Sequence, residues 1–112
     1  KDNTPLAAFG VMGGDMQPKG HVQVILGLID HALNPQSAID APRVRVLKER
    51  RVAVESALDP TVIRDLSGMG HLIEVTDEPA GFGGGQMIWR DPETGVFISG
   101  SEPRKDGLAA AW

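Results

Sequence analysis

The stretch that organises the chain reads Phe9-Gly10-Val11-Met12-Gly13-Gly14-Asp15-Met16-Gln17-Pro18-Lys19-Gly20-His21. An apolar strand leads into paired glycines and a polar loop, and an apolar helix is predicted next, from about His21 to Leu33. Glycine lets backbone N–H groups approach a ligand, and a helix N-terminus adds unsatisfied donors and partial positive charge. Gly13 and Gly14 therefore fit a small anion or oxyanion pocket. A glycine pair alone more often makes a plain tight turn, so both interpretations stay open at this point.

Three nucleotide-binding interpretations of the glycines fail. A P-loop needs Gly-Lys-Ser/Thr, whereas here Lys19 precedes Gly20 and His21 stands where the hydroxyl is required. The dinucleotide fingerprint Gly-x-Gly-x-x-Gly is absent from this turn. The later glycine-rich run 81–85 leads into a predicted strand, 86–89, rather than a helix. No nucleotide cofactor is therefore expected.

Composition narrows the function classes further. The chain has 112 residues, 41% of them hydrophobic, which suits one globular domain or part of one. Its net charge of −4 argues against a nucleic-acid partner, and the dense positive spot at 48–51 is interpreted as a solvated hairpin tip. Without cysteine there is neither a disulfide framework nor a thiol nucleophile. No segment resembles a signal peptide or a membrane span, so no membrane partner is expected.

The first strand, 4–12, is apolar throughout and is expected to be covered on both faces. The helix after it is apolar on nearly all sides, so it is expected to be buried between layers. Gly27 in its middle predicts a close contact, and Asn34-Pro35 is expected to end it. The helical stripe predicted to pack comprises Val22, Ile25, Leu26, Ile29 and Leu33.

The remaining pattern alternates short helices and hairpins. Asp59 and Pro60 have the chemistry of a helix start, and Asp91 to Gly95 that of a turn. The resulting order predicts an α+β fold in which antiparallel strands carry helices on one face. The expected elements are a helical turn at 35–40, a hairpin of 43–47 with 51–55, a helix from 60 to 68 or 70, a strand at 71–76, a hairpin of 86–90 with 96–100, and a tail at 101–112.

Residues 9–21 with Gln23-Val24 resemble the gamma-glutamyltranspeptidase family, in the branch that carries Gly-Gly-x-Met-Gln-Pro-x-Gly-His. The resemblance extends over nearly all 112 residues in the family's order. Glu102 departs from it, since the family usually has aspartate there, but the charge is kept. The further matching blocks are Asn34-Pro35-Gln36, Ala38-Ile39-Asp40-Ala41-Pro42-Arg43, Val54-Glu55, Gly70-His71, Phe82-Gly83-Gly84-Gly85-Gln86 and Gly100-Ser101-Glu102-Pro103-Arg104-Lys105-Asp106-Gly107.

This resemblance implies part of the αββα sandwich of N-terminal-nucleophile hydrolases. In that family a precursor cleaves itself into two subunits, and the new N-terminal threonine of the small subunit is the nucleophile. Residues 1–112 resemble the C-terminal portion of the small subunit, a single partial domain, so the nucleophile is expected upstream of Lys1. The chain's own threonines, Thr4, Thr61, Thr76 and Thr94, lie in no matching context.

The resemblance assigns Gly13 and Gly14 as oxyanion-hole donors through their backbone N–H groups. Met12 and Asp15 flank them and are candidate substrate-binding residues. For Asp15, capping of the following helix is an equally weighted alternative.

The other charged and imidazole groups are expected to be structural. Arg43 and Arg104 should pair with a carboxylate, with Asp40 and Asp106 as the candidates. His21 is interpreted as a hydrogen-bonding residue at the helix start rather than a general base. The three histidines have no metal-ligand spacing, so no metal site is expected.

The resemblance implies hydrolysis or transfer of gamma-glutamyl groups from glutathione-like amides, without a cofactor. The expected partners are the remaining large-subunit and small-subunit segments of the same precursor and a small gamma-glutamyl substrate. A homo-oligomer also stays open. Cephalosporin-acylase-like or polyglutamate specificity is an alternative within the family. A piece that only completes another subunit's fold, without catalysis, is the alternative outside it.

Overall fold

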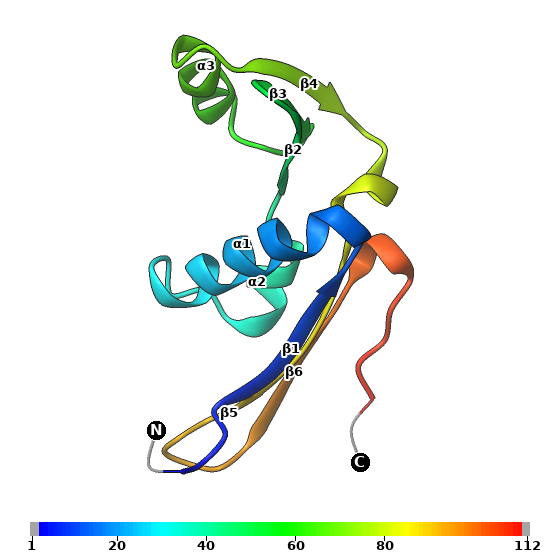
Figure 1. Ribbon diagram of the computed structural model, residues 1–112. Coiled ribbons are helices and arrows are strands. Elements are labelled where there is room, and N and C mark those ends of the chain that lie inside the picture. The colour runs from blue at the N-terminus through cyan, green and yellow to red at the C-terminus, as the bar shows by residue number, and fades with distance from the viewer. Residues whose placement is uncertain (1–2, 111–112) are drawn as a thin grey trace.

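The computed structural model describes residues 3–110, which form two three-stranded sheets (Figure 1). Sheet A has the order β1-β5-β6 and is antiparallel, and sheet B has the order β2-β3-β4. The predicted α+β class is confirmed. The strands are β1 (Ala7–Met12), β2 (Val44–Lys48), β3 (Arg51–Glu55), β4 (Leu72–Thr76), β5 (Gly84–Arg90) and β6 (Phe97–Ser101).

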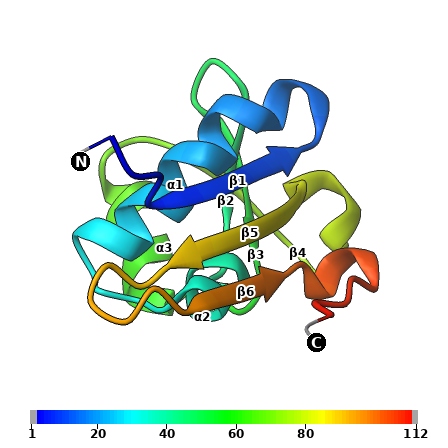
Figure 2. The ribbon, with the colours of Figure 1, turned by 90° about the horizontal axis from the view of Figure 1, so that it is seen from below.

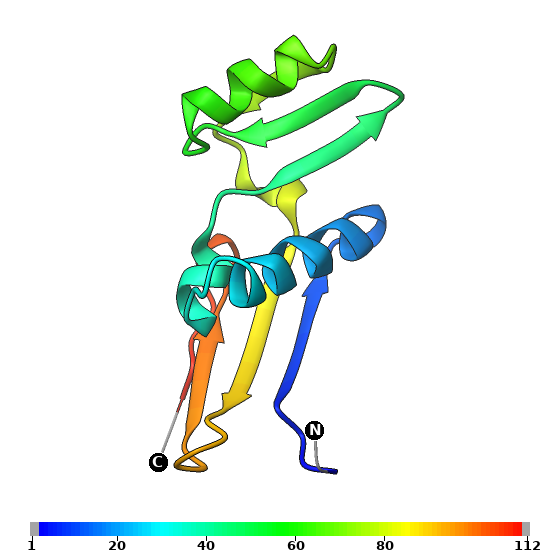
Figure 3. The ribbon, with the colours of Figure 1, turned by 90° about the vertical axis from the view of Figure 1, so that its left-hand side faces the viewer.

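Two helices, α1 (Gln17–Ile29) and α2 (Pro35–Asp40), lie on one face of sheet A, and α3 (Pro60–Gly68) accompanies sheet B (Figure 3). The opposite face of sheet A is free of helices, and Figure 2 looks onto it. Three short 3₁₀ turns complete the elements, namely η1 (Gly14–Met16), η2 (Pro79–Phe82) and η3 (Pro103–Lys105). No helix in the described range is long and apolar enough to cross a membrane.

A small core forms between sheet A and its two helices. It consists of Val11, Val24, Ala38, Ile39 and Met87, all nearly inaccessible to water. Because α1 lies directly on β1, this core fixes the helix against the strand that ends in the paired glycines.

Helix α1 begins at Gln17, four residues before the predicted start at His21. Pro18 is tolerated there because the first turn of a helix needs no backbone donor. The helix also ends earlier than predicted, since Ala32 adopts φ 51° and Leu33 N–H donates to the Gly27 carbonyl at 2.9 Å. Asn34 instead caps α2, with its side chain accepting from Ser37 N–H.

The packing face of α1 differs from the predicted stripe. Val22 and Ile29 are 55% and 71% exposed, so these residues do not face the core. The buried positions are Gly20, Val24 and Gly27, because small residues let the helix backbone come close to β1 and α2. The predicted close contact at Gly27 is confirmed: a Cβ there would lie 3.4 Å from the Cβ of Ala38.

The first strand is also shorter and less covered than predicted. It begins at Ala7 rather than residue 4, and Ala8, Gly10 and Met12 are exposed on the face of sheet A that carries no helix. The expectation that both faces are covered is therefore wrong for the chain by itself. The residues that pack are Phe9 and Val11, which point toward α1.

Sheet B contains a parallel pairing, which the sequence pattern did not predict. Strands β3 and β4 run parallel, joined by the crossover through α3, whereas only antiparallel pairing was expected. The two predicted hairpins are confirmed, as is the start of α3, where the Asp59 side chain accepts from Thr61 N–H at 2.7 Å. The expected tail contains η3, and its part beyond Ala110 lies outside the described residues.

Candidate functional site

The paired glycines form the turn between β1 and η1, and both have positive φ. Gly13 has φ 133° and Gly14 has φ 56°, values that residues with a Cβ rarely adopt. The Gly13 carbonyl accepts from Met16 N–H at 3.0 Å, which closes the turn. Within the described residues, the N–H groups of Gly13 and Gly14 donate no hydrogen bond. The turn therefore presents two neighbouring donors that an outside acceptor can use.

A second glycine turn packs against this one from the start of β5. A Cβ on Gly13 would lie 3.0 Å from the Cα of Gly83, and a Cβ on Gly83 would lie only 2.5 Å from the Met12 carbonyl oxygen. Gly83 also has positive φ, 81°. The glycine-rich run 81–85 thus supports the turn at Gly13 by backbone contact. The sequence pattern placed this run before a strand. It did not predict that the run packs against the turn at Gly13, because that contact joins segments far apart in the chain.

His21 fastens the helix to the strand just before the glycines. Its Nε2 accepts from the N–H of Val11 at 3.3 Å, and its Nδ1 lies 2.5 Å from the Gln17 carbonyl oxygen. Because a carbonyl can only accept, Nδ1 carries the proton, and the ring is a neutral bridge. The Phe9 ring packs on it, with centroids 5.4 Å apart. The predicted role of His21 as a hydrogen-bonding residue at the helix start is confirmed.

Met12 and Asp15 flank the glycines, and both side chains are exposed. Asp15 does not cap a helix, which overturns one of its two predicted roles. The N-cap positions of η1 and α1 are Gly13 and Met16, and neither helix start has a side-chain cap. Among the described residues, the Asp15 carboxylate has no hydrogen-bond or ion-pair partner.

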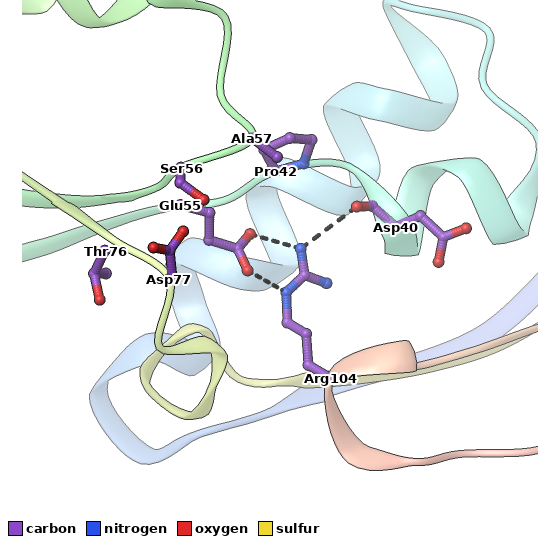
Figure 4. Close-up of a pocket in the computed structure, with 8 residues that line it drawn as sticks. All are labelled: Asp40, Pro42, Glu55, Ser56, Ala57, Thr76, Asp77 and Arg104. Atoms are coloured by element: carbon purple, nitrogen blue, oxygen red, sulfur yellow. Dashed lines mark hydrogen bonds and ion pairs between the residues drawn. The ribbon is translucent and has the colours of Figure 1, made fainter.

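Four buried or half-buried charged groups join the two sheets behind the glycine turns. Arg43 pairs with Glu102 at 2.8 Å, and both side chains are almost completely inaccessible to water. Arg104 pairs with Glu102 at 2.7 Å. It also pairs with Glu55 at 2.6 Å, as Figure 4 shows. The predicted carboxylates were wrong: Asp40 gives Arg104 only its backbone carbonyl, at 3.5 Å, and Asp106 pairs with neither arginine.

This network holds the segment that supports Gly13. Arg43 donates to the carbonyl of Phe82 at 3.0 Å, and the Glu102 carboxylate accepts from the N–H of Gly85 at 2.6 Å. Burial alone raises the pKa of Glu102, but the Gly85 N–H and the guanidinium groups of Arg104 and Arg43 outweigh it and hold that pKa below its ordinary value. Burial lowers the pKa of Arg104, but the carboxylates of Glu55 and Glu102 outweigh it and hold that pKa above its ordinary value. Both ends of the network therefore stay charged.

A cavity of about 130 Å³ adjoins the network, lined by Glu55, Arg104, Thr76 and Asp77 among others (Figure 4). Its arginine is already paired, so this cavity is structural. No group of three or more potential metal ligands comes together among the described residues.

Comparisons with known proteins agree on one family. The family model described as gamma-glutamyltranspeptidase matches residues 1–112. The glutathione hydrolase-like YwrD proenzyme of Bacillus subtilis is 31% identical over 97% of this chain and 22% of its own length. The chain thus spans about a fifth of that curated relative.

Solved structures show the same likeness. The cephalosporin acylase of Bacillus halodurans is 49% identical, with a TM-score of 0.95 over 100% of this chain and 21% of the acylase. The gamma-glutamyltranspeptidase T380A mutant of Helicobacter pylori is 26% identical, with a TM-score of 0.79 over 93% of this chain and 56% of its own. The two sheets and their helices match the N-terminal-nucleophile hydrolase fold of these neighbours. The chain belongs to the gamma-glutamyltranspeptidase family.

Proposed function

We propose that this chain is the C-terminal part of the small subunit of a gamma-glutamyl hydrolase or transferase, and that Gly13 and Gly14 form its oxyanion hole. The observation that carries the proposal is the pair of adjacent N–H groups without an acceptor at the end of β1. Their turn is supported by Gly83 and held against α1 by His21. Such donors stabilise an oxyanion because they are already in place when charge develops.

The chemistry follows from this geometry and from the family. A threonine outside this chain attacks the substrate amide carbon, and the carbonyl oxygen becomes an anion in the tetrahedral intermediate. The N–H groups of Gly13 and Gly14 bind that oxygen more strongly than the neutral carbonyl, so they lower the barrier, by about 3–4 kcal/mol for each donor. Collapse of the intermediate breaks the C–N bond, the leaving amine takes up the proton that the threonine hydroxyl gave up, and an acyl-threonine remains. Water then gives hydrolysis, and a second amine gives transfer.

Met12 and Asp15 are assigned to the wall of the same pocket. Both are exposed and adjoin the donors, and the Asp15 carboxylate has no partner among the described residues. A carboxylate there suits the ammonium group of an amino-acid substrate. The segments that bind the rest of the gamma-glutamyl group belong to other parts of the same precursor, which are the partners of this chain.

Cleavage of the acyl amide of a cephalosporin is a second candidate, favoured by one observation. The Bacillus halodurans cephalosporin acylase is 49% identical over the whole of this chain. Both candidates use the same oxyanion hole, because both cleave an amide. They differ in the acyl group, whose contacts lie mostly outside this chain.

The complete precursor distinguishes these candidates. Expressed in full and allowed to mature, it is expected to release p-nitroaniline from gamma-glutamyl-p-nitroanilide and to be inactivated by a reactive glutamine analogue. Residues 1–112 alone are expected to give only the blank rate, since they lack the nucleophile. If the matured protein cleaves an N-acyl cephalosporin but does not cleave the anilide, the acylase activity is favoured. Cleavage of neither substrate by the matured protein would favour the non-catalytic alternative.

A further inference from the structure

A groove of about 620 Å³ runs between the start of α1 and strand β2. Gly14 is among the residues that line it, so the groove adjoins the turn assigned to the oxyanion hole. In Figure 3 the N-terminal end of α1 and the hairpin of β2 and β3 lie on the same side of the molecule. The lining residues are Gly14, Asp15, Gln17, Pro18, Lys19, Arg45, Val46, Leu47 and Lys48.

The groove is positively charged in a chain whose net charge is −4. Lys19, Arg45 and Lys48 line it, and Asp15, next to Gly14, is the only carboxylate in its described lining. The Lys19 ammonium donates a hydrogen bond to the backbone carbonyl oxygen of Asp15 at 2.9 Å. Among the described residues, the side chains of Arg45 and Lys48 have no hydrogen bond and no ion pair.

Arg45 is the unusual member, because it is half-buried without a counter-ion. Its guanidinium lies against η2, with Nη1 2.7 Å from the place of a Cβ on Gly81. The absence of a side chain at Gly81 makes room for that position. Arg43 and Arg104, the two arginines that join the sheets, each pair with a carboxylate. A half-buried guanidinium that lines a groove without such a partner is suited to bind a carboxylate from outside, because its donors match the two carboxylate oxygens.

Building on the proposed function, we propose that this groove binds carboxylates on the part of the substrate beyond the scissile amide. Arg45 and Lys48 are the binding residues, and the ligand class is a gamma-glutamyl peptide with acidic residues after the first glutamyl group. Continuity with Gly14 favours a peptide over a free anion, since the ligand then extends from the carbonyl held at the glycines. Its volume is that of a small-ligand site, and Pro18, Val46 and Leu47 give it an apolar wall.

Two chromogenic substrates isolate the proposed contact in the complete, matured enzyme. Gamma-glutamyl-p-nitroanilide has no carboxylate beyond the amide, and gamma-glutamyl-3-carboxy-4-nitroanilide has one. The double variant R45Q/K48Q is expected to raise KM for the carboxylated anilide about tenfold, and to leave KM for the other within about twofold. Because the contact lies away from the reacting atoms, kcat should stay constant on both. Raising NaCl to about 0.5 M should move the wild-type KM for the carboxylated anilide toward that of the variant.

R50Q is the matched control, since Arg50 is an exposed arginine on the same hairpin and does not line the groove. It should leave both KM values unchanged. K48Q alone removes an exposed side chain, so it provides a folded variant if R45Q disturbs maturation, with an expected rise of about threefold.

Three results would overturn the inference. One is an unchanged ratio of the two KM values in R45Q/K48Q and in K48Q. Another is an equal rise on both substrates, which would make these cations structural. The last is competitive inhibition by inorganic phosphate that R45Q/K48Q abolishes while the KM ratio stays constant, which would make the groove a site for free anions. Wild-type enzyme that cleaves neither anilide would instead overturn the proposed function on which the inference rests.

Discussion

Glu102 carries a negative charge into a site that water does not reach, and it is held there by Arg43, Arg104 and the N–H of Gly85. Removing one member of such a group leaves the others charged and unpaired. We expect E102Q to destabilise the complete enzyme by about 3 kcal/mol, measured as a lower thermal midpoint. E74Q is the control, because Glu74 pairs with Arg51 at the surface, where the loss should stay within about 1 kcal/mol. Equal midpoints for E102Q and E74Q would contradict this account.

The same carboxylate predicts a pH dependence. The pKa of Glu102 is lower in the folded chain than its ordinary value, so its ionised form favours folding above the unfolded pKa, about 4.3. That stabilisation is expected to disappear as pH falls below about 4 and through the lower folded pKa. E102Q should therefore show a shallower loss of stability than wild type over this acidic interval. Parallel stability curves for the two proteins would show that Glu102 does not titrate in this way.

At single residues, the sequence predicts conformation better than partnership. Positive φ at Gly13 and Gly14 follows from the need for glycine where the chain turns toward a ligand. The partners of Arg43 were mispredicted, because the carboxylate that reaches a buried arginine is chosen by sheet packing. Glu102 lies 59 residues away in the chain, and no spacing rule connects the two.

Among the elements, the contact of α1 with β1 decides how rigidly the glycine turn is held. Gly20 lies against Val11, and a Cβ there would come within 2.6 Å of the Val11 Cγ1 atom. Val11 is buried and branched, so it cannot yield. We expect G20A to destabilise the complete enzyme by about 1–3 kcal/mol, measured by thermal unfolding.

Gly68 provides a glycine-to-alanine control in a helix. It ends α3, and no atom lies within 4 Å of the position of its Cβ. G68A should therefore be neutral or stabilise by up to about 1 kcal/mol. A G20A enzyme as stable as G68A would mean that α1 does not press on β1 as the structure indicates.

The elements themselves were largely predictable, because hairpins and helix starts have local signals such as Asp59 with Pro60. The prediction of which face of α1 is buried was wrong. The sequence rule favours large apolar residues for a packing face, whereas α1 packs through Gly20, Val24 and Gly27. The parallel pairing of β3 with β4 was not predicted for a related reason. It depends on the crossover through α3 and not on the residue pattern of either strand.

Over the whole molecule, the most prominent feature is an apolar surface on the face of sheet A without helices. Ile88 on β5 and Phe97 on β6 are 51% and 69% exposed, and Leu6, just before β1, is 44% exposed. A surface of this kind marks a covered interface. We expect the isolated chain to self-associate in sedimentation experiments, and I88K/F97K to reduce that association. A compact monomer at high concentration would count against the view that part of a sandwich is missing.

The central claim is that the N–H groups of Gly13 and Gly14 bind the oxyanion. Gly14 is the position that tests it, because no atom lies within 4 Å of where its Cβ would be, while a Cβ on Gly13 would strike Gly83. Valine at Gly14 adds its methyl groups to the pocket and strains a turn with φ 56°. G95V is the control, since Gly95 has a similar φ of 76° in the hairpin turn between β5 and β6.

The measurement is kcat for gamma-glutamyl-p-nitroanilide in the complete enzyme, with the mature and unprocessed forms assayed separately, since self-cleavage passes through a similar tetrahedral centre. We predict that G14V lowers kcat of the mature form about a hundredfold or more, while G14A has a milder effect and G95V leaves it near wild type. If G14V matures normally and keeps a wild-type kcat, the paired glycines are only a turn and the oxyanion hole lies elsewhere.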